Sequence, residues 1–285
     1  MDKLRNLATT RFITLVVILS ASLLAFSTNY YYKNVYLDIE RSFWASLDSS
    51  LKLDGVAREI ENSVGSQSST NTIEHSFAGE LQTRSVVQID NGGDIVSVQS
   101  YGYPDADYIR YDKIELRDEI EQSKAQDAVD VWAVESNQPT QLRDSLVRAF
   151  VLFGKIDKSE RDQIVDGLRR AYSVNFDNAR KETLDDRLVY SYDVEIDLPS
   201  FYETLGLYLR AQGLDEFAQF IEEQAALVTS GQSLSMELVI DPRSRNIVEI
   251  SEASGVQKIT SHGTSFDIQR PDTDIDFGDL QQLLE

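Results

Sequence analysis

Residues 187–197 read Arg-Leu-Val-Tyr-Ser-Tyr-Asp-Val-Glu-Ile-Asp, and no other stretch of the chain predicts a strand so strongly. Every second residue from Leu188 to Ile196 is apolar, and the residues between them are mostly polar. A period of two is typical of a strand that buries one face and exposes the other. The stretch therefore predicts a sheet with one face against a core.

Helices are predicted directly after this strand. Pro199 is followed by Ser200-x-x-Glu203, a capping box that predicts a helix from Ser200 to about Arg210. Gly213 ends this helix, and a second one is expected from Asp215 to about Leu227.

The rest of the chain gives further strands and helices. Asp90-Asn91-Gly92-Gly93 joins two strands, and Asn-Gly accepts positive φ at both central positions of a hairpin turn. The polar residues 61–72 predict a loop. Other predicted strands are 56–60, 73–78, 81–90, 94–101, 107–115, 131–134, 234–241, 246–252 and 256–268. Other predicted helices are 35–52, 141–152 and 158–173, the last capped by Asp157 with Glu160.

Strands and helices follow one another in groups, without regular βα alternation and without a GxGxxG motif. A doubly wound nucleotide-binding fold is therefore not expected. We predict an α+β fold in which helices pack on one face of an antiparallel sheet.

The N-terminal segment predicts attachment to a membrane. Residues 12–28 are uncharged and mainly apolar, with Lys3, Arg5 and Arg11 before them and three tyrosines at 30–32 after them. Basic residues stay on the cytoplasmic side, and tyrosines favour the membrane interface. We predict a cytoplasmic N-terminus (1–11), a transmembrane signal anchor (12–32), an extracytoplasmic domain (33–270) and an acidic C-terminal segment (271–285). A cleaved signal peptide is the alternative, because Ala25 and Ser27 form a small-x-small pair.

Composition excludes several classes of function. The chain has 285 residues, 48 of them acidic and 27 basic, for a net charge of −21. Such a surface repels nucleic acid, so no nucleic-acid partner is expected. The chain has no cysteine, which excludes disulfides, thiolate metal sites and lipid attachment at an N-terminal cysteine.

Chemical motifs are also lacking in the sequence. His75 and His262 are 187 residues apart and lie in no metal-binding motif. Residues 272–278 are similar to a calcium loop, but Phe277 and Leu283 stand where that loop needs glycine and glutamate, so an acidic tail is the better interpretation. There is no G-x-S-x-G elbow and no P-loop, so we predict no catalytic residue, no metal and no cofactor.

Three stretches resemble the exported lipoprotein-carrier superfamily, which includes LolA and the mycobacterial LppX/LprG proteins. They are residues 103–111 (Tyr-Pro-Asp-Ala-Asp-Tyr-Ile-Arg-Tyr), residues 189–197 with the helix-Gly213-helix segment after them, and residues 236–242 (Met-Glu-Leu-Val-Ile-Asp-Pro). The turn after residue 242 departs from the family's Gly-Leu-Pro, and the hydrophobic segment would replace the family's lipidated cysteine. The resemblance implies a strongly bent antiparallel half-barrel closed by helices, with an apolar cavity.

The resemblance implies a non-enzymatic domain that holds a lipid or other apolar ligand beside the bilayer. The candidate lining residues are Phe43, Trp44, Tyr108, Tyr111, Trp132, Tyr190, Tyr192, Phe217 and Phe220. The alternative is a filled core in a surface structural or interaction protein, and a hydrolase is a third, more distant interpretation.

Overall fold

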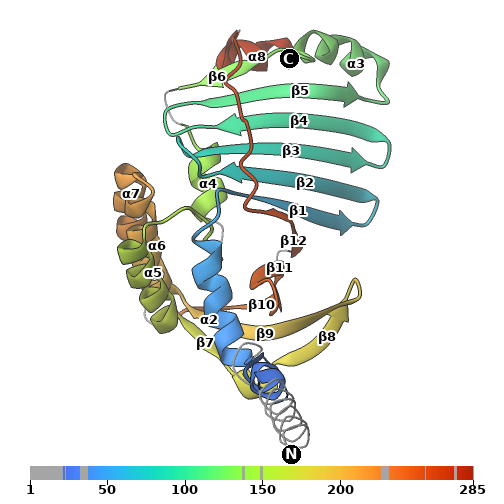
Figure 1. The fold of residues 1–285 in the computed structure, drawn as a ribbon. Coiled ribbons are helices and arrows are strands. Elements are labelled where there is room, and N and C mark those ends of the chain that lie inside the picture. The colour runs from blue at the N-terminus through green and yellow to red at the C-terminus, as the bar shows by residue number, and fades with distance from the viewer. Residues whose placement is uncertain are drawn as a thin grey trace, which may run out of the picture.

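The computed structural model describes residues 22, 24–32, 38–136, 139–147, 150–225, 231–253, 255–272 and 275–284. Within them the chain forms a mixed α+β fold built on one large, open, curved sheet, with its helices gathered mainly on one side (Figure 1). The prediction of an antiparallel sheet with packed helices is confirmed at this level.

The sheet has thirteen strands, which run in the order β13-β6-β5-β4-β3-β2-β1-β12-β11-β10-β9-β7, with β8 paired to β9. They are β1 (Gly55–Val64), β2 (Gln67–Ser76), β3 (Gln82–Asn91), β4 (Asp94–Gly102), β5 (Asp107–Glu115), β6 (Ala133–Glu135), β7 (Tyr172–Val174), β8 (Arg180–Leu184), β9 (Arg187–Asp197), β10 (Ser233–Asp241), β11 (Asn246–Glu252), β12 (Gly255–His262) and β13 (Ile275–Asp276). All these pairs are antiparallel except β13 with β6.

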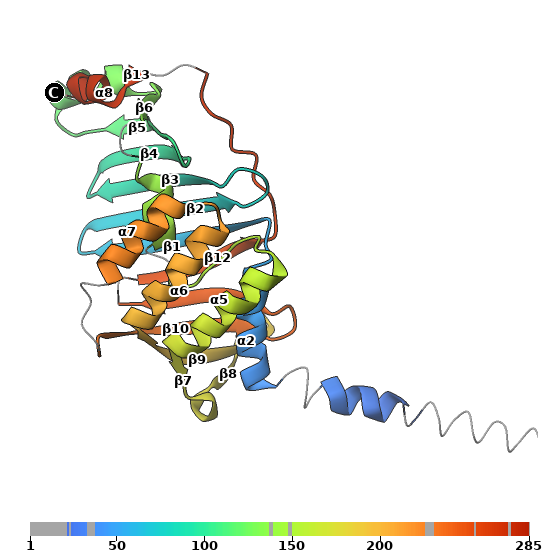
Figure 2. The same ribbon diagram turned by 90° about the vertical axis from the view of Figure 1, so that its left-hand side faces the viewer.

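The helices are α2 (Ile39–Ser50), α3 (Glu119–Ala125), α4 (Gln141–Val147), α5 (Lys158–Ala171), α6 (Leu198–Ala211), α7 (Asp215–Ala225) and α8 (Phe277–Leu284), with short 3₁₀ turns η2 (Gln126–Ala128) and η3 (Phe176–Asn178). Figure 2 shows α5 and α6 over the lower strands of the view, which are β7 and β9–β11, and α4 against the middle of the sheet. Much of the same face of β3–β5 has no helix over it. We call the side of the sheet that faces these helices the inner face.

The curvature of the sheet has local causes. The strand register shifts between Ala57 and Arg58 where β1 meets β12, between Ser97 and Val98 where β4 meets β5, and between Val239 and Ile240 where β10 meets β11. An unpaired residue in one strand bends that strand and increases its twist. The sheet therefore curls around the helices instead of lying flat.

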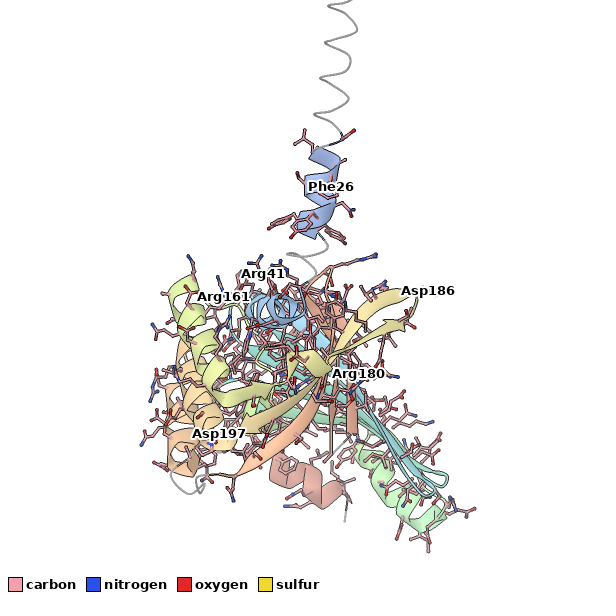
Figure 3. All side chains as sticks on the ribbon, turned by 90° about the horizontal axis from the view of Figure 1, so that it is seen from below. Phe26, Arg41, Arg161, Arg180, Asp186 and Asp197 are labelled. Atoms are coloured by element: carbon pink, nitrogen blue, oxygen red, sulfur yellow. The ribbon has the colours of Figure 1, made fainter. Side chains whose placement is uncertain are left out.

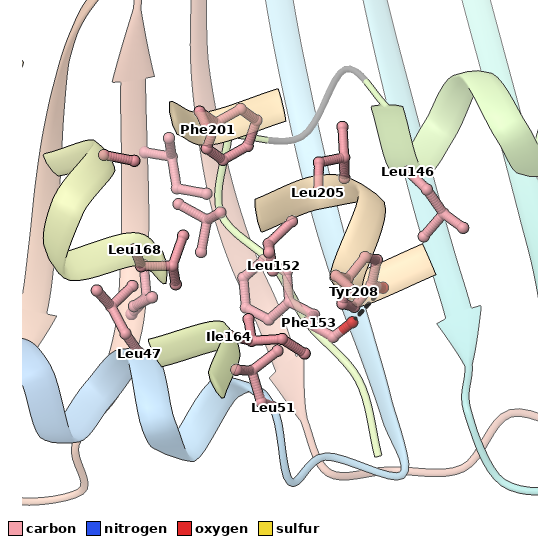
Figure 4. Close-up of a cluster of buried hydrophobic side chains, with 14 of the residues drawn as sticks. Leu47, Leu51, Leu146, Leu152, Phe153, Ile164, Leu168, Phe201, Leu205 and Tyr208 are labelled. Atoms are coloured by element: carbon pink, nitrogen blue, oxygen red, sulfur yellow. Dashed lines mark hydrogen bonds between the residues drawn. The ribbon is translucent and has the colours of Figure 1, made fainter. Parts of the chain in front are cut away.

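A continuous hydrophobic core fills the space between the helices and the lower strands. Helix α2 contributes Phe43 and Leu47, and the apolar face of β9 contributes Tyr192, all fully buried. Figure 4 shows side chains from α2, α5 and α6 meeting in this layer, with the Tyr208 hydroxyl donating a hydrogen bond to the Phe153 carbonyl at 2.7 Å. The alternating pattern of residues 187–197 is thus the wall of a packed core.

Some sequence-based predictions are wrong in detail. Residues 61–72 form most of the β1–β2 hairpin, which turns at Gly65 with φ of 63°. Polar strands form there because neighbouring strands satisfy the backbone groups on both sides, whereas the loop prediction considered side chains alone. The turn after β3 uses Gly92 and Gly93, both with positive φ, and Asn91 belongs to the strand.

The helix caps also differ from the predicted ones. Asp197, and not Ser200, caps α6, accepting a hydrogen bond from the Ser200 backbone N–H at 3.1 Å. Asp157 stands at the predicted cap position of α5 but makes no side-chain hydrogen bond there. The segment 271–285 is more than an acidic tail, because it contains β13 and α8, and Leu280 of α8 is fully buried.

The predicted transmembrane segment lies mostly outside the described residues. Residues 24–31 are helical, and Figure 3 shows the helix that carries Phe26 standing away from the domain. Across the described part of the chain, no helix combines the length and apolar character needed to cross a membrane. The exposed large apolar residues of this helix and the turn after it are Leu24, Phe26, Tyr30, Tyr31 and Tyr32.

Candidate functional site

The nine aromatic residues predicted to line a cavity lie in different surroundings. Phe43, Tyr190 and Tyr192 are buried in the main core, and Trp44 and Phe217 pack against it. Tyr108 and Trp132 belong to a second cluster on the outer face with Ile268, Tyr111 to a third with Leu280, and Phe220 is 41% exposed. Apart from Phe220, these side chains are divided among three separate clusters, and those of the main core pack against one another.

A cleft of about 230 Å³ lies on the inner face of the sheet, beneath α4. Its floor is formed by β1, β2, β3 and β12, and its roof is the first turns of α4. The lining residues are Arg58, Ile60, Asn71, Ile73, Thr83, Ser85, Gln141, Asp144, Ser145 and Gln257. The cleft begins where the packed core ends, since Arg58 also contacts the space bounded by Phe153 and Tyr208.

Arg58 is the unusual residue of this cleft. It is only 5% exposed, and it points inward from β1 between Val56 and Ile60. Its guanidinium donates hydrogen bonds to the Ser145 carbonyl at 2.8 Å and the Gln257 Oε1 at 3.4 Å. Among the residues that the structure describes, its Nε has no hydrogen-bond partner. Burial lowers the pKa of Arg58 to about 10, so the side chain still carries its charge at neutral pH.

His75 lies beside Arg58 and is almost fully buried. Its Nε2 is 3.1 Å from the Ser145 hydroxyl, which itself donates to the Leu142 carbonyl at 2.7 Å. The hydroxyl therefore accepts from the His75 Nε2–H, and Nδ1 has no partner in the described structure. Burial, and then the charge of Arg58, hold the pKa of His75 well below its usual 6.5, so the imidazole is neutral.

The position of α4 over the cleft depends on a buried carboxylate. Asp107 of β5 is 3% exposed, and its Oδ2 accepts hydrogen bonds from the backbone N–H groups of Thr140 and Gln141 at 2.5 and 2.9 Å. These are donors that a helix start leaves without intrahelical partners. Gly102 allows close contact, because a Cβ there would lie 2.6 Å from the Leu142 nitrogen.

A row of paired side chains begins in the cleft and crosses five strands. Ile60 pairs with Asn71, Asn71 with Val87, Val87 with Val98, and Val98 with Tyr111. Directly paired residues lie on the same face of a sheet, so these five side chains form a row across β1–β5 on the inner face. All of them except Asn71 are apolar, and we call them the apolar row. Val87 of β3 and Val98 of β4 are half-buried, and Figure 2 shows no helix over much of this face of the two strands.

A wider groove between α2 and α5, of about 820 Å³, is a less suitable site for an apolar ligand. It includes Trp44, but most of its lining is charged, with five acidic residues, Arg41 and Arg169. Within the described residues, no group of histidine and acidic side chains is placed to hold a metal ion. This finding does not cover the predicted calcium-like segment as a whole, because residues 273–274 lie outside the described residues.

Sequence reasoning missed Arg58, Asp107 and the cleft. The sequence did hold one signal. Arg58 shares a strand face with the apolar residues Val56 and Ile60, whereas an arginine would be expected on the face toward solvent. The apolar row depends on which residues of five strands stand opposite one another, and no local pattern contains that information.

Comparisons with known proteins are few. No family model and no curated protein matches this chain. Among solved structures, LprF from Mycobacterium bovis is similar, with 11% sequence identity and a TM-score of 0.39, over 81% of this chain and 97% of that one. The function of this chain therefore has to be argued from its own geometry.

Proposed function

We propose that this protein is a non-enzymatic binding module outside the cytoplasm that holds a lipid or other amphipathic ligand on the inner face of its sheet. The observation that carries the proposal is the cleft beneath α4, which opens onto the apolar row. The ligand would lie at the open edge of the core, because the described apolar side chains between the helices and the sheet pack into one continuous buried cluster.

The size of the cleft supports this arrangement. At about 230 Å³ it is smaller than the 300–1,000 Å³ typical of pockets that enclose a whole small molecule. A polar group and the first carbons of a chain fit such a volume, and a longer chain would extend over Val87 and Val98. Burial of each methylene contributes about 0.8 kcal/mol, so partial coverage of several methylenes gives useful affinity.

Membrane anchoring through the N-terminal segment would give the module access to its ligand. The exposed apolar residues at 24–32 are in keeping with a helix that meets lipid, and the uncharged run before them extends the same character. A domain tethered at the bilayer surface can take lipid from the adjacent leaflet without diffusing through water.

Photocrosslinking of the full-length protein tests this function. The protein would be placed in phosphatidylcholine vesicles that contain a long-chain lipid with a diazirine on the chain, and labelled peptides identified by mass spectrometry. We expect labelling of β3 and β4 around Val87 and Val98. Val87→Asp should abolish that labelling, because it puts a charge in the apolar row.

Val86→Asp is the matched control. Val86 precedes Val87 on the same strand, and its side chain lies on the opposite face. Any loss of strand propensity is therefore shared by both variants, and only a ligand on the inner face distinguishes them. Labelling spread evenly over both faces, or equal labelling of the two variants, would refute the proposal.

The filled core favours a second candidate, a surface interaction or structural protein without a ligand. Within the described ranges, thirty-three buried residues form one continuous cluster, as expected when burial serves stability alone. Such a protein would use its acidic surface to bind a basic partner, and the complex should dissociate as salt is raised. An absence of inner-face labelling together with a salt-sensitive partner would favour this candidate.

A further inference from the structure

We propose that the cleft beneath α4 recognises the anionic oxygen head group of its ligand, and that Arg58 is the residue that pairs with it. This inference rests on the proposed function and deepens it, because it names the chemical class of the ligand. A carboxylate and a phosphate monoester share the required chemistry.

The hydrogen bonds of Arg58 leave its charge without a counter-ion. A guanidinium has five N–H donors, and here two of them reach neutral acceptors, Ser145 O and Gln257 Oε1. None of the ion pairs among the described residues involves Arg58. Its Nε also finds no hydrogen-bond partner in the described part of the chain, and with 5% of the residue exposed it has little access to water.

Such a residue is costly in a structural role. Buried arginines are normally paired with carboxylates, because transfer of an unpaired charge out of water is strongly unfavourable. A methionine or leucine would fill the same place beside Tyr208 and Phe153 without that cost. An anion in the cleft supplies the missing charge, and the hydrogen bonds between a guanidinium and a carboxylate or phosphate are stronger than those between neutral groups.

The other charges near the cleft do not replace a ligand. Asp144 lines the cleft, but its carboxylate lies 3.1 Å from the Arg143 Nε. Glu252 attracts Arg58 electrostatically without forming an ion pair with it. His75 is neutral. Asn71, Ser85 and Gln141 add neutral polar groups to the lining. Although the net charge of −21 repels anions at long range, Arg58 attracts them at contact distance in a site of low dielectric.

Three probes with the same diazirine-bearing sixteen-carbon chain test the inference. Their head groups are a carboxylate, a phosphate monoester and a neutral hydroxyl, each at the same mole fraction in phosphatidylcholine vesicles that carry the full-length protein. The measurement is made at about pH 8.5, where the acids are ionised and Arg58 is protonated. We expect inner-face labelling by at least one anionic probe to exceed labelling by the alcohol about tenfold.

Arg58→Met should reduce anionic labelling to the level of the alcohol, and Arg58→Lys should retain part of the preference. Arg84→Met is the control, because Arg84 lies on the outer face beside Glu74. The comparison of probes on the unaltered protein needs no variant and remains decisive if Arg58→Met does not fold. The ratio of carboxylate to phosphate labelling identifies the source, a fatty acid or a lipid with a phosphate monoester head group.

Equal inner-face labelling by all three probes would overturn the head-group inference and leave the proposed function intact. An unchanged preference in a folded Arg58→Met variant would overturn it equally. The absence of inner-face labelling by every probe, the alcohol included, would instead refute the proposed function itself.

Discussion

Asp107 shows how a single buried side chain positions the roof of the cleft. Its two hydrogen bonds hold residues 140 and 141, and its Oδ1 has no partner among the described residues. Burial raises the pKa of this carboxyl, while the two backbone N–H groups oppose that rise. The acid therefore stays in an unfavourable environment because it satisfies the start of α4.

Removal of this carboxylate should destabilise the protein. Asp107→Ala leaves two backbone donors without acceptors, so we expect the free energy of unfolding to fall by about 1–2 kcal/mol in urea titrations. Asp107→Asn keeps one acceptor oxygen in the same place and should lose less. A variant Asp107→Ala as stable as the unaltered protein would show that α4 does not depend on this cap.

His75 makes stability depend on pH in a defined window. In the unfolded chain its pKa is near 6.5, and in the folded protein it lies well below that value. Between the two values the unfolded state binds a proton that the folded state does not, so stability falls as the pH is lowered below 6.5. Above 6.5 both states are neutral and the residue adds no pH dependence.

The contribution of His75 is the difference in the pH dependence of the free energy of unfolding between His75→Gln and the unaltered protein. We expect the unaltered protein to lose up to about 1.4 kcal/mol more per pH unit than the variant, measured by urea unfolding from pH 7 to pH 5. His262, whose pKa burial also lowers, is still present in the variant, so its contribution cancels. Parallel pH profiles for the two proteins would contradict the assignment.

Among the elements, those with a strong local period were predicted best. Strand β9 has the bounds predicted from its alternating residues, and α5 and β5 lie close to theirs. The part of the β1–β2 hairpin formed by residues 61–72 was predicted as a loop, because its side chains are polar and its strands are held by backbone pairing. The site could not be predicted, because it arises where α4, β12 and three other strands meet.

Two helical glycines should respond to alanine with opposite signs. On α5, a Cβ at Gly167 would lie 2.5 Å from the Thr204 Oγ1 of α6, so Gly167→Ala forces these helices apart. On α6, a Cβ at Gly206 would have its nearest neighbour, Glu222 Oε1, at 3.6 Å, an ordinary contact. We expect Gly167→Ala to destabilise by about 1–3 kcal/mol and Gly206→Ala to stabilise by about 0.5–1 kcal/mol.

Thermal and urea unfolding of the two variants check this pair. Alanine improves helix propensity at both sites, so the sign at Gly167 reports packing alone. Stabilisation by Gly167→Ala would mean that α5 and α6 are not packed closely against each other.

At the scale of the whole molecule, the two halves of one sheet are packed differently. Its lower strands carry large apolar side chains and are covered by α2, α5 and α6, which makes a solid core (Figures 2 and 4). Its upper strands continue the same hydrogen-bonded surface with smaller side chains and little cover. The cleft lies at the boundary, so in the proposed function the packed half would hold the binding surface rigid without itself containing the ligand.

Membrane topology is the property of the whole chain on which this function depends. We expect a reporter that is active only outside the cytoplasm to be active when fused after Glu285. Lys3, Arg5 and Arg11 precede the uncharged run 12–28, and basic residues before such a run favour the cytoplasmic side. Charge reversal of all three to glutamate should greatly reduce reporter activity. The unaltered protein should also stay in membranes after an alkaline wash, and release of a shortened protein would indicate a cleaved signal.

A reporter active only in the cytoplasm would contradict the topology. The domain would then never reach the outer leaflet from which it is proposed to take lipid.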